Sequence, residues 1–471
     1  MSLAAFRTRI TTTHAVRDLS AGLIGEGRLI PGPEGDVPLI YADNVASGRA
    51  LTQVEDFIRD EVLPFYANTH TDASFCGAHT TALREAARAE IARITKAGDA
   101  HEVIFTGSGA TAGLNRLVHL LGVNRAERPV VFIGPYEHHS NILPWRESRA
   151  EVVEIPEAPE GGPDLEALAR ALHEHGQADL KIGAFSAASN VTGIITDPDP
   201  VIDLLRAHGA LAVWDYAGAG PYLNIDATRM DAIAVSPHKF PGGPGASGVL
   251  ILRKEAVRAR CPSWPGGGTV SFVSPWRHDY VDDLAAREEA GTPNIVGDIR
   301  AGLAFLVKEA VGEDTIAARE AQFRAMAEAA WGANPQITIL GADKPHRLPI
   351  FSLIIRDGAG EVVSPQLFTR MLSDLYGIQA RGGCACAGPY GHRLLGIEQA
   401  QSQAIHDALA AGDMVEKPGW TRLNFTYLDD TAKVARILDA ITELTAQIDQ
   451  HRPKYAFDPA SGQWSRRAKA A

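Results

Sequence analysis

Two short apolar runs decide the fold: "LAVWDYAGAG" at residues 211–220 and "DAIAVSPHKF" at residues 231–240. Each run has the length and composition of a buried β-strand and ends in polar or turn residues. Asp215 closes the first strand, and Lys239 comes just after the second. The pattern therefore places an acid and a lysine at successive strand ends, about one α/β step apart.

Strands and helices alternate on both sides of these two runs. Stretches with helical periodicity separate several of the apolar runs, which predicts an α/β domain with a mostly parallel sheet. From about residue 300 the chain changes to long helical stretches with a few strands, which predicts a smaller α+β domain. The predicted strands of the first domain are residues 102–107, 129–135, 151–156, 181–186, 211–215, 231–236 and 248–253.

These patterns divide the chain into four parts. Residues 1–37 are expected to form an N-terminal segment that packs with the small domain. Residues 38–300 are expected to form the large domain and residues 301–450 the small C-terminal domain. Residues 451–471 are polar, contain Pro and Gly and show little periodicity, so we expect a loosely attached tail.

Composition limits the classes of function. A chain of 471 residues is too long for one hydrophobic core, and no apolar run reaches the length of a membrane span. The net charge of −12 argues against nucleic-acid binding and favours a small-molecule partner. Four cysteines are too few for a disulfide framework, and this low cysteine content predicts a cytoplasmic protein. A single C-x-C pair is a poor zinc site, so no metal is expected.

A glycine-rich turn precedes one of the predicted helices. "GSGATA" at residues 107–112 matches the dinucleotide pattern G-x-G-x-x-G/A, but the acid expected after the next strand is absent, because that strand ends in Gly134 and Pro135. The turn still directs backbone N–H groups at an anion, most simply a phosphate. Ala110 and Thr111 would supply amides and one hydroxyl.

A phosphate cradle followed by Asp215 and Lys239 is what a pyridoxal phosphate enzyme needs. The lysine forms a Schiff base with the cofactor, and the acid keeps the pyridinium nitrogen protonated. His138 of "EHHSN" is placed to stack on the ring, and "SNVTG" supplies Asn190.

An ordered set of motifs extends this pattern along most of the chain. With it the chain resembles the class V branch of the fold-type I pyridoxal phosphate enzymes, and within that branch the cysteine desulfurases. The resemblance implies a fold-type I α/β architecture and a homodimer. The motifs are "YADNVASG", "TGSGATAGLN", "EHHSNILPW", "SNVTG", "WDYAGAG", "SPHKFPGGPGASG", "WPGGG", "EEAGTPN", "RGGCACAG" and "TRLNFTY".

The resemblance also implies roles for single residues around the cofactor. Lys239 would bind the cofactor, Asp215 would meet the ring nitrogen, and His138 would cover the ring. Asn190 would lie near the ring's phenolic oxygen or the substrate. The residues on the family's phosphate positions are Ala110, Thr111, Ser236 and His238, with Thr292 reaching over from a second subunit.

The two cysteines of "RGGCACAG" have the surroundings of a nucleophile. The glycines permit movement, and Arg381 favours the thiolate. The resemblance makes Cys386 the residue that takes sulfur from L-cysteine as a persulfide, leaving L-alanine, with a sulfur-acceptor protein as a further partner. Arg422 would bind the substrate carboxylate, with Arg381 as a second clamp. Cys384 is an extra thiol that packs, resolves an oxidised Cys386 or passes sulfur onward.

Two departures from the family keep other functions open. Gly218 stands where family members have a glutamine that donates to the phenolic oxygen, and the stretch between the cysteine loop and "TRLNFTY" is longer than in compact desulfurases. A class V aminotransferase or amino-acid epimerase would share Lys239 and Asp215 and need no thiol. A non-catalytic cofactor-binding protein is the third reading, and Lys239, Asp215 and Arg422 together argue against it.

Overall fold

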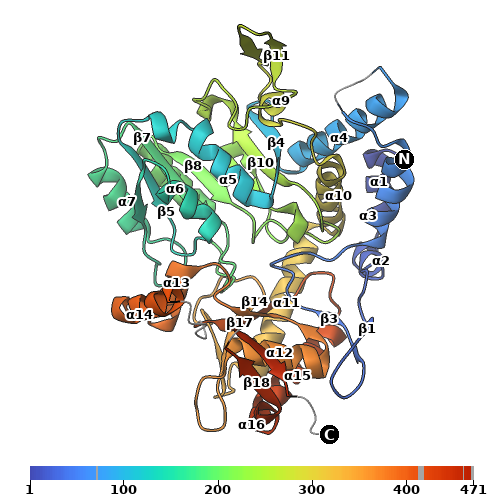
Figure 1. The fold of residues 1–471 in the computed structure, drawn as a ribbon, viewed down its shortest axis with the longest axis vertical. Helices are drawn as coiled ribbons and strands as arrows, with labels where there is room; N and C mark the ends of the chain where they lie inside the picture. The colour runs from blue at the N-terminus through green and yellow to red at the C-terminus, as the bar shows by residue number, and fades with distance from the viewer. Residues whose placement is uncertain (70–72, 412–417, 460, 468–471) are drawn as a thin grey trace. The chain divides into compact units, whose positions relative to one another are not determined.

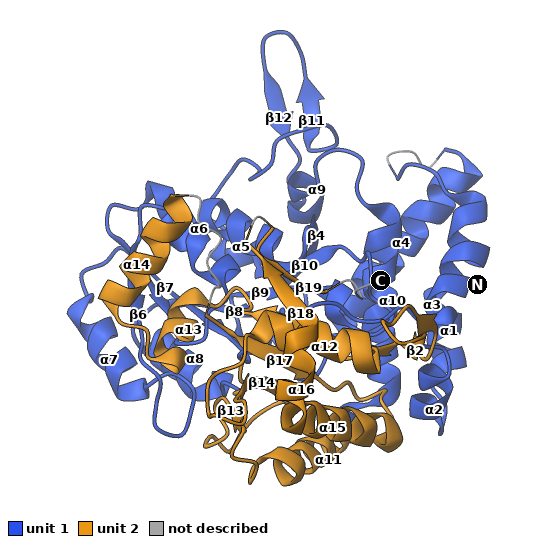
Figure 2. Cartoon of the chain, turned by 60° about the horizontal axis from the view of Figure 1, so that its bottom comes forward, with its two compact units in different colours: residues 1–24, 46–189, 195–317 blue, residues 25–45, 190–194, 318–471 orange. Residues whose placement is uncertain are grey.

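The computed structural model describes residues 1–69, 73–411, 418–459 and 461–467. The chain forms two compact units, coloured separately in Figure 2. Unit 1 comprises residues 1–24, 46–189 and 195–317. Unit 2 comprises residues 25–45, 190–194 and 318–471.

Unit 1 is built on a seven-stranded sheet with the order β4-β10-β9-β8-β7-β5-β6 (Figure 1). Strand β10 runs antiparallel to both of its neighbours, and the other neighbouring pairs are parallel. The seven apolar runs are these seven strands, so the predicted α/β fold with a mostly parallel sheet is confirmed. The strands are β4 (His101–Gly107), β5 (Pro129–Ile133), β6 (Glu151–Glu154), β7 (Leu180–Ser186), β8 (Leu211–Asp215), β9 (Ala232–Val235) and β10 (Gly248–Arg253).

Helices cover the sheet of unit 1, and every residue of β5 is buried, as in a parallel sheet packed on both faces. Leu114 and Leu117 of α5 pack in one core cluster with Leu250 of β10. The helices of the unit are α1 (Leu3–Ile10), α2 (Ala15–Ser20), α3 (Thr52–Phe57), α4 (Phe75–Ile94), α5 (Gly109–Leu120), α6 (Leu143–Arg146), α7 (Leu165–Glu174), α8 (Pro198–Ala207), α9 (Leu284–Glu288) and α10 (Ile295–Val311).

Two peripheral parts also belong to unit 1. Strands β11 (Val270–Val273) and β12 (His278–Tyr280) pair as a hairpin. We expected residues 1–37 to pack with the small domain; residues 25–37 belong to unit 2, whereas residues 1–24 belong to unit 1. The apolar side chains of residues 1–24 explain this, because Phe6 is fully buried and meets Phe57 of α3 edge to face at 5.4 Å.

Unit 2 contains an antiparallel sheet with the order β13-β14-β17-β16. Its core cluster joins residues of β14 and β17 to helices α12 and α15. The strands of the unit are β1 (Leu29–Ile30), β2 (Val37–Pro38), β3 (Ile40–Tyr41), β13 (Ile337–Ile339), β14 (Ile350–Ile355), β15 (Ile378–Gln379), β16 (Arg381–Gly383), β17 (Trp420–Asn424), β18 (Tyr455–Asp458) and β19 (Gln463–Arg466). The helices are α12 (Pro365–Tyr376), α13 (Gly388–Leu395), α14 (Gln399–Ala410), α15 (Thr431–Ala446) and α16 (Ile448–His451).

One long helical stretch of the sequence is two helices. Gly312, with φ of 85°, ends α10, and α11 (Glu313–Trp331) follows directly. Within the described residues, no helix is both long and apolar enough to cross a bilayer.

The C-terminal segment that we expected to be loosely attached forms the hairpin β18–β19. Tyr455 is 2% exposed and donates its hydroxyl to Asp374 Oδ2 at 3.1 Å, and Trp464 packs against the unit 2 core. These two aromatic side chains fix the hairpin to its unit. Part of the predicted tail, residues 460 and 468–471, lies outside the described residues.

Candidate active site

The acid and the lysine of the opening motifs lie on neighbouring strands of unit 1. Asp215 ends β8 opposite Ala234 of β9, two residues before Ser236, and Lys239 lies in the single helical turn that follows β9. Asp215 is 4% exposed, and its Oδ1 accepts the Ala217 N–H at 2.7 Å. Burial raises the pKa of Asp215, against the opposing effects of that hydrogen bond and the Lys239 charge.

The glycine-rich turn and the segment after β9 meet at the start of α5. The Ala110 N–H donates to Ser236 Oγ at 2.9 Å. Gly109 has φ of 59°, and a Cβ there would lie 2.9 Å from Ser236 Oγ and 3.0 Å from His238 Cε1, so only glycine fits. Burial, with the neighbouring Lys239 charge, lowers the pKa of His238 to about 4. A neutral imidazole, a hydroxyl and a helix N-terminus form a cradle that suits a phosphate.

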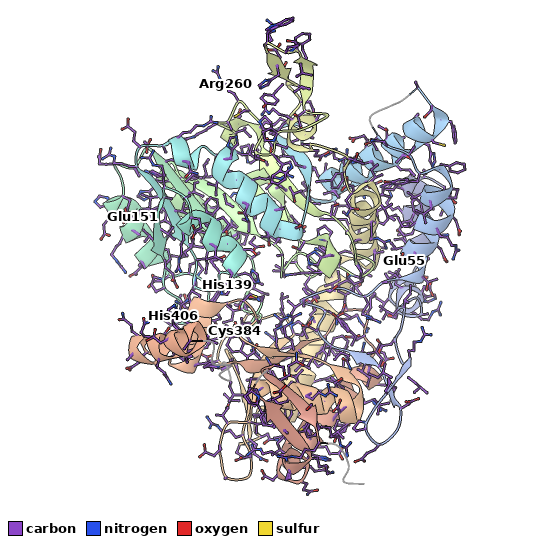
Figure 3. The ribbon with its side chains drawn as sticks, viewed as in Figure 1. Glu55, His139, Glu151, Arg260, Cys384 and His406 are labelled. Atoms are coloured by element: carbon purple, nitrogen blue, oxygen red, sulfur yellow. The ribbon has the colours of Figure 1, made fainter. Side chains whose placement is uncertain are left out.

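His138 and Thr111 are linked through a serine that the sequence did not single out. Thr111 Oγ1 and Ser140 Oγ are 2.7 Å apart, and His138 Nδ1 accepts the Ser140 N–H at 3.1 Å. Because Nδ1 is an acceptor, a neutral His138 carries its proton on Nε2. A pocket of about 460 Å³ lies beside this group and is lined in part by His139, which is labelled in Figure 3.

Glu137 is a buried acid that sequence reasoning missed. It is 2% exposed, and its Oε2 accepts hydrogen bonds from Asn141 Nδ2 and Ser186 Oγ, both at 2.6 Å. Burial raises the pKa of Glu137 to about 7 despite these donors, and Asp215 adds to the rise. The signal in the sequence was an acid two residues after the apolar run 129–135.

Thr292, the residue expected to serve a second subunit, lies in the loop before α10. It is exposed, and its hydroxyl accepts a hydrogen bond from Asn68 Nδ2 at 3.4 Å. The side chain is therefore at the surface of unit 1.

The thiols lie in unit 2, in the turn between β16 and α13. Cys386 is exposed and Cys384, labelled in Figure 3, is half-buried. The Ala387 N–H closes the turn on the Cys384 carbonyl at 3.2 Å. Both central residues have left-handed φ, 52° at Ala385 and 56° at Cys386, which is costly for side chains other than glycine. The turn therefore holds Cys386 outward in a strained backbone.

The two predicted clamp arginines are direct partners on neighbouring strands of unit 2, Arg381 in β16 and Arg422 in β17. Arg422 is 3% exposed and donates from Nη1 to the Asn190 carbonyl at 3.1 Å. Asn190 in turn donates from Nδ2 to the Ala385 carbonyl at 2.9 Å, which ties the thiol turn to the arginines. An ionised Cys386 is among the groups that favour the charged form of Arg422.

Asp43 is the residue of this cluster that sequence reasoning missed. Its Oδ1 accepts from Arg422 Nη2 at 2.8 Å, and its Oδ2 accepts from Arg381 Nε at 3.0 Å. The available signal was its place directly after the apolar run "LIYA", the same strand-end position that drew attention to Asp215.

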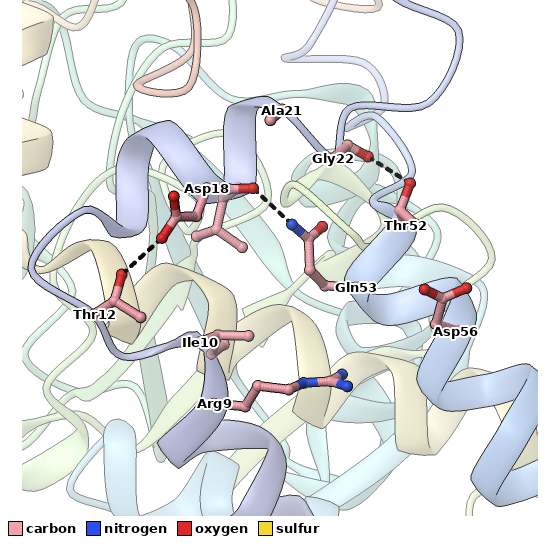
Figure 4. Close-up of a pocket in the computed structure, with 10 residues that line it drawn as sticks. Arg9, Ile10, Thr12, Asp18, Ala21, Gly22, Thr52, Gln53 and Asp56 are labelled. Carbon is pink, nitrogen blue, oxygen red and sulfur yellow. Dashed lines mark hydrogen bonds between the residues drawn. The ribbon is translucent and has the colours of Figure 1, made fainter.

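A further pocket of unit 1, of about 400 Å³, contains none of the predicted site residues. Figure 4 shows it between the N-terminal helices, with Thr12 donating to Asp18 Oδ2 at 3.1 Å and Gln53 donating to the Asp18 carbonyl at 2.7 Å. Across the part of the chain that the structure describes, no group of three or more His, Cys, Asp or Glu side chains is arranged to hold a metal ion.

Comparisons with known proteins show the family to which the chain is similar. Residues 40–405 match the model of the family described as aminotransferase class-V. A probable cysteine desulfurase of Halalkalibacterium halodurans is 30% identical over 75% of this chain and 85% of its own length. A cysteine desulfurase of Synechococcus elongatus is 28% identical over 75% of this chain and 55% of its own length.

Solved structures share the fold. An apo cysteine desulfurase from Thermococcus onnurineus superposes with a TM-score of 0.72 at 23% identity, covering 88% of this chain and 98% of that one. An Escherichia coli cysteine desulfurase, described as an S-sulfonic acid form, gives 0.71 at 22% identity over 91% and 98% of the two chains. The expected fold-type I architecture is thereby confirmed.

Proposed function

The chain belongs to the class V aminotransferase family, and we propose that it is a pyridoxal phosphate-dependent cysteine desulfurase that converts L-cysteine to L-alanine and receives the sulfur on Cys386. The observation that carries the proposal is the exposed thiol of Cys386, tied through Asn190 to the buried guanidinium of Arg422. An aminotransferase or an epimerase needs the arginine but has no use for the thiol.

The residues of unit 1 fit the cofactor. Ser236, His238 and the amides at the start of α5 would hold the phosphate, and Lys239 would bind the aldehyde carbon. The buried carboxylate of Asp215 would hold a proton on the ring nitrogen, and His138 would cover the ring. Pyridoxal phosphate, when bound, supplies the electron sink for negative charge at the substrate's α-carbon.

The chain's own groups carry the remaining steps. Arg422 and Asn190 orient the amino acid by its carboxylate, and Lys239 Nζ takes the proton from the α-carbon. The Cys386 thiolate then attacks the substrate sulfur, so that an S–S bond forms as the Cβ–S bond breaks. Lys239 returns its proton to the α-carbon, and the proton of the substrate thiol goes to the β-carbon, which gives alanine. The sulfur stays on Cys386 as an ionised persulfide.

The decisive experiment measures sulfide and alanine released from L-cysteine by the reconstituted protein with a reductant. Cys386→Ala should stop sulfide release while leaving cofactor absorbance and its response to L-cysteine unchanged, since the thiol acts after the α-proton has left. Lys239→Ala should abolish the borohydride-trapped cofactor. Mass spectrometry after a cysteine pulse should find one added sulfur, about 32 Da, on the Cys386 peptide. If Cys386→Ala keeps near wild-type activity, the aminotransferase or epimerase reading replaces this one.

We further propose a homodimer that works in the cytoplasm and passes its sulfur to an acceptor protein. Unit 1 exposes large apolar side chains on and beside the β11–β12 hairpin, with Trp276 89%, Trp264 68% and Val273 67% exposed. Exposed apolar groups of this size favour a protein partner. Sedimentation should give twice the mass of the 50.3 kDa chain, and Trp276→Ser should weaken the association. A monomer at micromolar concentration would contradict the proposal.

A further inference from the structure

The two arginines of unit 2 are an unfavourable pair in themselves. Arg381 and Arg422 stand directly opposite each other on antiparallel strands, where like charges repel. Burial lowers the pKa of Arg422, Asp43 opposes that effect, and the charge of Arg381 lowers it further. A pair of this kind needs an anion between its members.

Asp43 is that anion, and it divides its two oxygens between the arginines. Oδ1 accepts from Arg422 Nη2 at 2.8 Å, and Oδ2 accepts from Arg381 Nε and Nη2, each at 3.0 Å. Asp43 is 8% and Arg422 3% exposed, so the charge-assisted hydrogen bond between them is shielded from water, whereas Arg381 is exposed.

The backbone at Asp43 is fixed on both sides. The Ala42 N–H donates to the Gln379 carbonyl at 3.0 Å, and the Asn424 N–H donates to the Ala42 carbonyl at 2.8 Å. Asn424 Oδ1 accepts the Val45 N–H at 2.8 Å. Because these bonds hold the chain on both sides of Asp43, the carboxylate sets where the longer arginine side chains lie.

Unpartnered polar atoms remain in the cluster and at Asn44, the residue after Asp43. Arg422 Nε, Asn190 Oδ1 and Asn44 Nδ2 are buried and meet no hydrogen-bond partner among the described residues. Buried polar atoms in this state point to a ligand. Two arginines and one aspartate carry a single net positive charge, which matches the single negative charge of one carboxylate.

We propose that Asp43 is a positioning residue for the substrate carboxylate: it holds Arg422 and Arg381 side by side and leaves the cluster with one unit of positive charge. The inference rests on the proposed function, because it assigns the carboxylate of an amino acid to this cluster. Asp43 itself acts through the arginines and donates nothing to the substrate.

The test compares Asp43→Asn with the matched control Asp374→Asn. Asp374 is also buried in unit 2 and accepts a hydrogen bond from Arg370 Nε at 3.0 Å, and among the described residues no hydrogen bond or ion pair joins it to Arg381 or Arg422. Asp43→Asn should raise the KM for L-cysteine about tenfold or more, the loss of one charge-assisted hydrogen bond, with kcat little changed. Asp374→Asn should lower the melting temperature and leave KM unchanged.

A second variant separates positioning from mere folding. If Asp43 acts through the arginines, the effects of Asp43→Asn and Arg381→Gln on KM should not be additive, so Asp43→Asn/Arg381→Gln should raise KM by less than the product of the two single effects. Additive effects, an unchanged KM or a lower KM in Asp43→Asn would each overturn the proposal. The dissociation constant of L-alanine, followed by cofactor absorbance, should rise in parallel with KM. That binding measurement tests Asp43 even if L-cysteine releases no sulfide, the result that would refute the proposed function.

Discussion

Glu137 makes the stability of unit 1 depend on pH. Its pKa is raised from 4.5 to about 7 by burial, so the folded chain binds more protons than the unfolded chain between those two values. Stability therefore falls as the pH rises through this window, and the loss is complete above pH 7. A pKa moved from 4.5 to about 7 corresponds to about 3 kcal/mol.

The perturbation is Glu137→Gln, which removes the titration. The amide has one acceptor oxygen in place of two, so it cannot accept both from the Ser186 backbone N–H, which bonds Oε1, and from Asn141 Nδ2, which bonds Oε2, and the variant loses about 1 kcal/mol at every pH. The informative quantity is therefore the change between pH 5 and pH 8.5 in the free energy of unfolding, from urea titrations followed by tryptophan fluorescence. Over that range the wild type should lose up to about 3 kcal/mol more than the variant.

Glu289→Gln is the control, because that carboxyl behaves in the opposite way. Burial would raise the pKa of Glu289, but the charges of Arg88 and Arg84 outweigh it and hold the pKa below its ordinary value. Its contribution should be constant from pH 5 to pH 8.5. An equal pH dependence in the wild type and Glu137→Gln would refute the reasoning.

Three further outcomes test unit 2. Ala385→Gly removes a Cβ from a left-handed position and should raise the free energy of unfolding by up to about 1 kcal/mol in urea titrations, whereas a loss would contradict the strained turn. Arg422→Ala should raise the KM for L-cysteine far more than Arg381→Lys, since the loss of a buried charged pair costs about 2–5 kcal/mol, and equal small effects would place the clamp elsewhere. Cys384→Ala should keep at least about half of the sulfide release, as expected for a small packed thiol; complete loss would give Cys384 a part in the chemistry.

The sequence predicted what local periodicity controls. Seven apolar runs became seven strands because each run is self-contained, and Asp215 follows from its place at a strand end. Asp43 could not be predicted in the same way, since its partner Arg422 lies 379 positions away and only the folded chain brings them together. Glu137 is hidden for a similar reason, because Ser186 reaches it from another strand.

The thiol turn shows a different limit. The glycines of "RGGCACAG" predicted flexibility, on the view that glycine takes the unusual backbone angles. Gly383 does so, with φ of 120°, but Ala385 and Cys386 take left-handed angles as well. The Ala385 carbonyl accepts a tertiary hydrogen bond from Asn190 in this conformation, and residue preferences alone do not reveal such a contact.

Strand β16 has a bearing on how this region tolerates insertions and deletions. It is three residues long, and successive side chains in a strand point to opposite faces. A shift of one residue in its pairing with β17 would therefore move every side chain of β16 to the other face of the sheet. Losing Gly382 would turn Arg381 away from Arg422 and shorten the path to Cys386 by one residue. Substitution of a single residue in the stretch 381–386 leaves the spacing between Arg381 and Cys386 unchanged. We therefore expect relatives of this chain to vary here by replacement at constant length, and to vary in length only beyond the turn.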